Sequence, residues 1–316
     1  MMKRFYFIFT GFLCCVLLLS GCETSTMGGA TDVTRKQLLV VSTEQVNEMG
    51  TQAYNELLEM ARATNTLNTH EPTTRRVRAV ADRLIERAMV FRPEAREWGW
   101  QVNVVQSDEP KAYCLPGGKI LIYSGLITRI HPSDDELAAV IGHEMAHALR
   151  EHTREELSQK RAGGMARSAA GILIEALSQS FGDATGYRKV AETGHSVLSE
   201  LSDVTKQLTL LSYSRVMEEE ADVLGMELMA RAGYNPNAAI MFWKKMGGLR
   251  AAGTARQSDQ DAHWSSHPSD QRRIAVMEQH LRTLEPIYVA TFRQRQAAEK
   301  AHAAAAAQRR RGSAGR

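Results

Sequence analysis

The stretch HEMAHALREH, from His143 to His152, holds side chains that could bind a metal and move a proton. His143 and His147 are four residues apart, and residues at this spacing lie on one face of a helix, one turn apart. Two imidazoles in that arrangement can bind one tetrahedral zinc ion. Glu144 is rotated by about 100° from His143 around the helix, so it stays out of the tetrahedron but can take a proton from an attacking water molecule. The pattern H-E-x-x-H therefore indicates zinc-dependent hydrolysis, with a solvated surface helix as the alternative.

The third histidine of the stretch is not expected to complete the metal site. In metzincins the third histidine follows the second by six residues, and Thr153 stands at that position here. His152 lies about 140° around a continuous helix from His147, so it would not face the same metal. We expect His152 to be solvated or to contact the ligands from outside.

An acidic run further along the chain is the best source of a third ligand. The run MEEEAD ends at Asp222, and its Glu218 lies four residues earlier, on the same helical face. One of these carboxylates can ligate zinc while the other orients a histidine ligand. Glu219 and Glu220 are expected to point elsewhere. The alternative is a solvated acidic cluster, although an apolar helix follows it.

Both halves of this site require helices. Ser133 and Glu136 form a capping box before the apolar residues 137–141, so the H-E-x-x-H helix is expected to begin there. The acidic run falls in a helix expected over residues 214–232, which Gly233 ends. Further helices are expected over residues 42–61 and 74–89 and after the dipeptides Asn-Pro at 235–236 and His-Pro at 267–268.

Two stretches have the character of strands. Residues 98–105 alternate between apolar and polar side chains. Residues 112–123 form a turn flanked by strand-like residues. Pro116 in this second stretch has no N–H to donate to a sheet, which suits an edge position.

The composition is that of a globular chain, with 43% hydrophobic and 24% charged residues among 316. The formal net charge of +3 comes from the ends of the chain, because residues 290–316 carry seven Arg and Lys and one acid. No basic face appears elsewhere, so nucleic-acid binding is not indicated.

The N-terminus is typical of a targeting segment. Lys3 and Arg4 precede an apolar stretch, residues 5–19, that is short for a membrane span. The following Leu-Ser-Gly-Cys resembles the bacterial lipobox, which implies removal of residues 1–21 and lipidation of Cys22. Glu23, in place of Asp, favours the outer membrane. An ordinary signal peptide or an uncleaved anchor is the alternative.

Cysteine usage excludes a disulfide within the mature chain. Cys14 and Cys15 leave with the signal and lipid blocks Cys22, so Cys114 has no cysteine to pair with.

The order of these motifs resembles a known family. H-E-M-A-H, then Glu218-x-x-x-Asp222, then His267-Pro with Arg273 six residues after the histidine, is similar to the HtpX/CAAX-prenyl-protease-like zinc metallopeptidases, metallopeptidase family forty-eight. The stretch around Leu115–Gly118 is similar to their edge element, with Lys111 and a tyrosine at 113 in place of the usual Asn and Phe. The resemblance spans residues 45–284 and is to the periplasmic lipoprotein members.

The resemblance implies roles for individual residues. His143, His147 and Glu218 would hold one Zn²⁺ per chain. Glu144 would act as general base and then as general acid, and Asp222 would support the ligands.

Further roles come from the same resemblance. Leu115, Pro116, Gly117 and Gly118 would bind the substrate backbone by strand addition. His267 would approach the zinc or the transition state, or block the metal as a latch, and its alternative is local packing at a helix start. Arg273 would stabilise the oxyanion, and its alternative is a solvated arginine.

The predicted fold is α+β, a mostly helical gluzincin-type metallopeptidase domain with a small β-sheet whose edge strand lines the active-site cleft. The predicted parts are a signal peptide (1–21), a flexible tether from lipidated Cys22 (22–40), the metallopeptidase domain (41–286) and an Ala/Arg-rich extension (287–316). The tail is expected to be solvated.

The predicted function is zinc-dependent endopeptidase activity on misfolded or misassembled envelope proteins. Its place would be the periplasm of a Gram-negative bacterium, lipid-anchored to the outer membrane, with the outer-membrane assembly machinery as a partner. The alternative is a chaperone or assembly module for outer-membrane proteins with latent protease activity, in which residues 153–212 form a lid. A third hypothesis is an anchored scaffold with a chance motif, which would hold no zinc.

Overall fold

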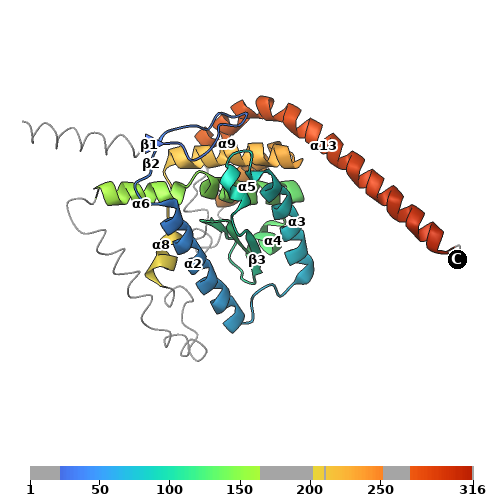
Figure 1. The fold of residues 1–316 in the computed structure, drawn as a ribbon, viewed down its shortest axis with the longest axis horizontal. Coiled ribbons are helices and arrows are strands. Elements are labelled where there is room, and N and C mark those ends of the chain that lie inside the picture. Colours follow the sequence, from blue (N-terminus) through green and yellow to red (C-terminus); the bar gives the residue numbers. More distant parts are fainter. Residues whose placement is uncertain (1–21, 164–201, 210, 252–270, 315–316) are drawn as a thin grey trace, which may run out of the picture.

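The structure is a computed structural model that describes residues 22–163, 202–209, 211–251 and 271–314 (Figure 1). Its strands are β1 (Cys22–Glu23), β2 (Gln37–Leu38), β3 (Gln101–Val105), β4 (Ala112–Leu115) and β5 (Lys119–Tyr123). Its helices are α2 (Thr43–Ala63), α3 (Glu71–Ala88), the 3₁₀ turn η1 (Pro93–Arg96), α4 (Ser124–Ile130), α5 (Asp134–Leu149), α6 (His152–Gly163), α8 (Asp203–Thr209), α9 (Arg215–Ala232), α10 (Asn237–Ala251) and α13 (Gln271–Ala314). The described chain is mostly helical with a small sheet, which confirms the predicted α+β class.

The three-stranded sheet has the order β3-β5-β4. β3 is parallel to β5, and β4 is antiparallel to it. The stretch expected at a sheet edge is therefore divided, because β4 lies at the edge and β5 is central. β5 shows why the core has two parts: Ile120 and Ile122 pack in the larger cluster, and Leu121 points to the smaller cluster beneath α2.

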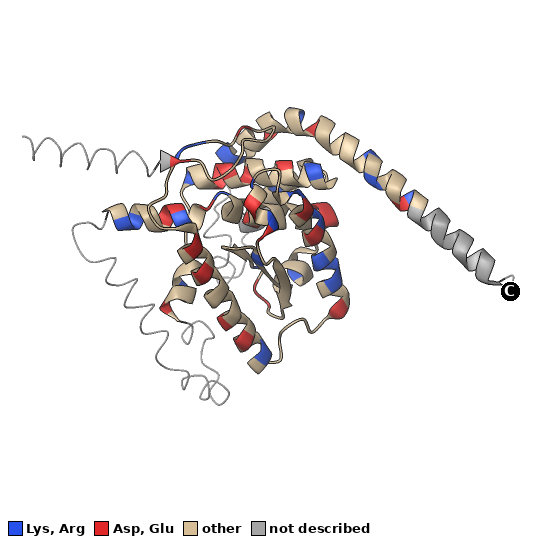
Figure 2. Ribbon diagram, in the orientation of Figure 1, with Lys and Arg blue, Asp and Glu red and all other residues tan. Residues whose placement is uncertain are grey.

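α5 and α9 lie at the centre of the helical layer, with α3, α10 and α13 packed around them. The predicted capping box of Ser133 and Glu136 begins α5, and Gly233 ends α9 in the left-handed conformation. Every residue of α5 from Leu137 to Leu149 is buried. Charged residues of both signs are interspersed along the described helices (Figure 2). Within this part of the chain, no helix is long and apolar enough to cross a membrane.

The N-terminal strap, residues 22–42, differs from the flexible tether expected over 22–40. β1 pairs with β2, and the segment between them lies along α9 and α6 (Figure 1). The amides of Ala30 and Thr31 donate to the buried carboxylate of Glu227 over 2.8 and 2.9 Å, and Gln37 donates to the carbonyl of Arg150 over 2.7 Å. The tether prediction is wrong for this stretch, because small polar residues without hydrophobic periodicity are fixed here by hydrogen bonds to buried partners.

The backbones of α5 and α9 come into contact where two glycines face each other. A Cβ atom on Gly225 would lie 2.9 Å from the backbone nitrogen of His143 and 3.0 Å from the carbonyl carbon of Gly142. Gly225 is seven residues, about two turns, from Glu218, so the contact and the acidic side chains share one face of α9. The absence of a side chain therefore sets the distance between the helix that carries the histidines and the helix that carries the carboxylates.

We expect Gly225→Ala to destabilise the protein. Alanine is better than glycine in a helix by about 1 kcal/mol, but an extra methyl in a packed contact typically costs about 1–3 kcal/mol. Backbone atoms receive this methyl and cannot rotate away, which places the cost in the upper part of that range, about 2–3 kcal/mol. After the helix gain of about 1 kcal/mol, we expect a net loss of about 1–2 kcal/mol in the free energy of unfolding, measured by urea denaturation. Gly142→Ala is the matched control, because its nearest contact, 3.2 Å to the Gly225 carbonyl oxygen, is looser. A Gly225→Ala protein as stable as the wild type would contradict this account of the crossing.

Candidate metal centre

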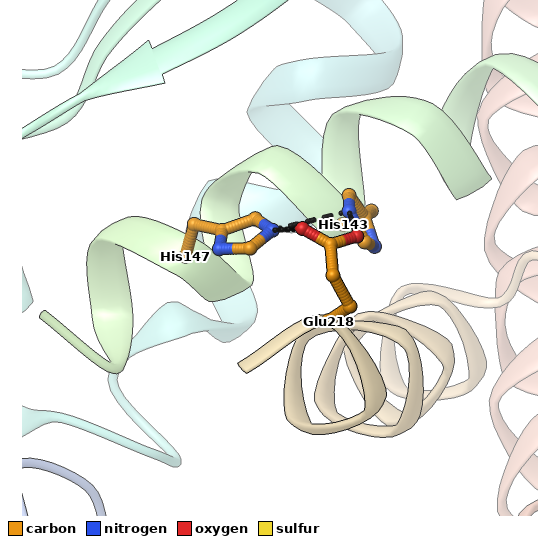
Figure 3. Close-up of side chains that lie close together, drawn as sticks. All are labelled: His143, His147 and Glu218. Atoms are coloured by element: carbon orange, nitrogen blue, oxygen red, sulfur yellow. Dashed lines mark hydrogen bonds and ion pairs between the residues drawn. The ribbon is translucent and has the colours of Figure 1, made fainter. Parts of the chain in front are cut away.

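Three buried side chains converge between α5 and α9 (Figure 3). Nε2 of His147 lies 3.1 Å from Nε2 of His143. The Glu218 carboxylate oxygens lie 3.4 Å from His143 Nε2 and 3.5 Å from His147 Nε2. Ligand atoms at the usual zinc distances of about 2.0–2.1 Å in a tetrahedron lie about 3.3–3.4 Å apart. The predicted ligands are therefore brought together with the spacing and donor types that fit one zinc ion.

The electrostatics of this site favour a cation. Burial lowers the pKa of His143, but hydrogen bonds to Asp222 and Glu218 and the charges of both carboxylates outweigh burial and raise the pKa to about 9. The same carboxylates would stabilise the positive charge of a metal ion.

The His143 side of the site is supported from α9 and α13. Nδ1 of His143 lies 3.1 Å from Oδ1 of Asp222, which leaves Nε2 directed at the other ligands. The Arg273 guanidinium donates two hydrogen bonds of 2.7 Å to Asp222, and its Nη1 lies 3.0 Å from Glu218. Burial raises the pKa of Asp222, but the charge and hydrogen bonds of Arg273 hold this pKa below its usual value. Asp222 thus orients His143 as an ionised carboxylate.

Arg273 is 2% exposed and lies over the Trp243 ring, 4.5 Å from its centroid. The alternative of a solvated arginine is therefore wrong. The guanidinium contacts two carboxylates of the site, and a role in oxyanion stabilisation stays a prediction. His267, the other residue taken from the same motif, lies outside the described residues.

Glu144 belongs to α5, which packs against the edge strand β4. Burial raises the pKa of Tyr113 and of Cys114 on the edge strand β4, and the negative charge of Glu144 raises both further. Glu144 itself is 5% exposed. The candidate proton acceptor is therefore held between the ligand helix and the sheet edge.

The turn predicted to bind substrate backbone follows β4. Leu115 ends this strand, and Pro116, Gly117 and Gly118 form a buried turn with positive φ at both glycines. Pro116 packs against Gly50 of α2. The turn thus packs against α2, and the strand β4 packs against α5.

His152 contacts the ligand His147 from outside the ligand set, which is one of the two places expected for it from the sequence. Nδ1 of His152 lies 2.9 Å from Nδ1 of His147, and its Nε2 lies 3.0 Å from Oε2 of Glu220. The predicted 140° assumed a continuous helix. In the structure α5 ends at Leu149, Glu151 takes the left-handed conformation with φ 51°, and a new helix starts at His152.

Glu220 was expected to point away from the site, yet it is buried and belongs to this network. Burial raises its pKa, but hydrogen bonds from His152 and Arg35 and the charge of Arg150 lower the pKa to about 2. Burial also lowers the pKa of His152, against the effect of Glu220. Tyr213 completes the surroundings of His147, because its ring stacks on the imidazole with centroids 4.1 Å apart.

Comparison with known protein families accounts for this arrangement. The model of "Peptidase family M48" matches residues 71–281, which are about two thirds of the chain and include the three candidate metal ligands. The chain belongs to this family. The family prediction is confirmed at this level, and the chain is a metalloprotease, a hydrolase of peptide bonds.

Individual relatives agree with this assignment. The chain is 30% identical over 247 residues to the mitochondrial metalloendopeptidase OMA1 of Schizosaccharomyces pombe, which covers 78% of this chain and 64% of the relative. It is 33% identical over 181 residues to OMA1 of Arabidopsis thaliana, covering 57% of this chain and 31% of the relative. It is 25% identical over 187 residues to the beta-barrel assembly-enhancing protease of Escherichia coli K12, covering 59% and 35%. The chain thus spans less than two thirds of these relatives.

We expect Glu218→Gln to lose zinc. The substitution keeps the shape of the side chain but removes the charge that faces both histidines. Groups that only orient the ligands already contribute about 10–100-fold to metal affinity. We therefore expect the zinc affinity of the variant to fall by at least about tenfold, which would appear as a lower zinc content after dialysis. Glu219→Gln is the matched control, because the neighbouring Glu219 pairs with Arg272 outside the ligand set. Full zinc retention by Glu218→Gln would place the third ligand elsewhere.

Proposed function

We propose that this M48 metalloprotease is a zinc-dependent endopeptidase that degrades misfolded or misassembled proteins of the bacterial envelope. The observation that carries the zinc assignment is the convergence of His143, His147 and Glu218. The two Nε2 atoms are 3.1 Å apart and lie 3.4 and 3.5 Å from the two oxygens of Glu218, close to the spacing of tetrahedral zinc ligands. When bound, zinc would polarise a peptide carbonyl and make water acidic enough to attack it near neutral pH.

Glu144 is the residue placed to move the proton. It follows the first histidine on α5 and is 5% exposed, so its carboxylate acts with little competition from bulk water. It would accept the proton of the attacking water and then deliver it to the leaving amine. The chain's own contribution to the reaction is this proton transfer, together with fixed ligands.

The edge strand β4 is the proposed substrate site. It pairs with β5 on one side only among the described strands, and it lies beside α5. An extended peptide can add to such an edge by main-chain hydrogen bonds. A peptide bound along Ala112–Leu115 would pass close to Glu144, and Leu115 with the turn Pro116–Gly118 would bound the end of this site.

The finer family and location are also proposals. The motifs favour the HtpX/CAAX-like branch, and the lipobox-like sequence at Cys22 favours a lipoprotein of the outer membrane. One relative is named a beta-barrel assembly-enhancing protease, which supports an envelope role near outer-membrane assembly. The same name supports the second candidate, an assembly module in which cleavage is latent.

We expect Glu144→Gln to keep zinc and to lose cleavage of an unfolded protein such as casein. Loss of a general acid–base group lowers rates by about 10²–10⁴-fold, whereas the three ligands are unchanged. Zinc content of the variant and chelator-treated wild type are the controls. Casein digestion at the wild-type rate would contradict the role of Glu144. Rescue of an envelope defect by this variant would favour the assembly module.

We expect Cys22→Ser to leave the membrane. A lipid attached at Cys22 would hold the wild type in the outer-membrane fraction, and serine cannot be lipidated. Fractionation of cells that express each form, with the mass of the N-terminal peptide, measures the difference. Cys114→Ser is the control. A Cys22→Ser protein that remains in the outer membrane would show that lipidation does not anchor it.

A further inference from the structure

Arg35, in the strap of residues 22–42, contacts Glu220, which belongs to the network of side chains around the ligand His147. The Arg35 guanidinium donates to both oxygens of Glu220 over 2.8 and 2.9 Å, and to both oxygens of Glu155 over 2.7 and 2.8 Å. Each carboxylate accepts two parallel hydrogen bonds from the guanidinium. Such a pair fixes the orientation of the carboxylate and also stabilises its negative charge. Arg35 thus joins α6 and α9 at the point where Glu220 faces inward.

Glu220 passes this constraint to the ligand His147. When Nε2 of His147 binds the metal, its Nδ1 would carry the hydrogen and donate to Nδ1 of His152, which lies 2.9 Å away. The carboxylate of Glu220 can only accept, so Nε2 of His152 donates to it over 3.0 Å. With a metal on Nε2 of His147, a single arrangement of protons satisfies the whole row Arg35–Glu220–His152–His147.

A second arginine, Arg150, connects this network to the strap by hydrogen bonds. Arg150 is fully buried, and its Nη2 lies 3.1 Å from both Glu220 Oε1 and the carbonyl oxygen of Arg35. Its Nη1 donates to the hydroxyl groups of Thr24 and Thr26 over 3.0 and 3.1 Å. The strap therefore supplies acceptors that a buried guanidinium at the end of α5 needs.

The two histidine ligands are supported from different parts of the chain. His143 is held by Asp222 and Arg273, which lie inside residues 71–281, the part that matches the family. His147 is held by a row that ends at Arg35, before the matched region begins. The support of His147 is thus completed by a segment that lies outside the part of the chain matched by the family model.

We propose that Arg35 is a positioning residue of the metal centre, which acts through Glu220 and His152 to hold the ring of His147 for metal binding. The strap is then part of the catalytic unit and more than a connection to the N-terminus. This inference rests on the zinc site proposed above.

The test compares zinc affinity among variants of the full chain, by competition with a chromophoric chelator. We expect His152→Leu to raise the zinc dissociation constant by about 10–100-fold, the range for groups that orient ligands. His152→Asn should lose less, because its amide oxygen can accept from His147. Arg35→Gln should raise the constant by about tenfold, the lower end of this range.

Arg76→Gln is the matched control for Arg35→Gln. Its side chain is 33% exposed against 34% for Arg35, and it pairs with Asp134 away from the metal. We expect its zinc dissociation constant to equal that of the wild type. The visible spectrum of the cobalt-substituted proteins gives a second measurement, in which Arg35→Gln and His152→Asn should shift the bands and Arg76→Gln should not.

These measurements separate the inference from the site on which it rests. Wild-type protein that binds no zinc would remove the metal centre itself. Wild type that binds zinc, with Arg35→Gln and His152→Asn folded by circular dichroism and within twofold of its dissociation constant, would overturn the positioning role. The variants Arg35→Gln and His152→Asn therefore test the positioning role even where His152→Leu does not fold.

Discussion

The contact between α5 and α9 at Gly142 and Gly225 is the constraint on which the metal centre depends. Neither helix holds the ligand set alone, because α5 supplies the two imidazoles and α9 supplies the carboxylate. Two backbones meet there without an intervening side chain, so the distance between the helix axes is set by main-chain atoms that cannot change rotamer. Metal ligands must be placed to within a few tenths of an ångström, and a contact of this kind meets that requirement better than a layer of flexible side chains.

The second determinant is the charge enclosed between these helices. Glu218 and Asp222 are both buried beside His143, Arg273 balances one of their two negative charges, and the raised pKa of His143 shows that the other favours a second positive charge at the ligands. Uncompensated buried charge is costly, so the folded domain is arranged to gain from a divalent cation. Metal binding and folding should therefore be thermodynamically linked in this domain.

Sequence reasoning succeeded where a local rule decides the structure. The capping box at Ser133, the end of α9 at Gly233 and the helical spacing of the acidic run are all found as expected. The exclusion of His152 from the ligands holds, but the continuous helix assumed for its angle is wrong, because α5 stops at Leu149 and nothing in the residue pattern marks the left-handed Glu151 strongly. Glu220, expected to point elsewhere, was missed for the same reason, since its partner His152 lies on the new helix.

The strap was missed for a different reason. Its order comes from hydrogen bonds between polar side chains and partners more than a hundred residues away, such as Gln37 with the carbonyl of Arg150. Such bonds leave no periodic signal in the sequence, so a short polar segment looks the same whether it is fixed or free. Only the position of buried acceptors in the folded domain distinguishes the two cases.

The cysteine on the edge strand has a consequence for chemical durability. Burial and the nearby charge of Glu144 raise the pKa of the Cys114 thiol well above its usual value, so it stays protonated at neutral pH. Oxidants and electrophiles react with thiolates far more readily than with thiols. The Cys114 thiol is therefore unreactive in the folded domain, and a change between oxidising and reducing conditions should leave this side chain as it is.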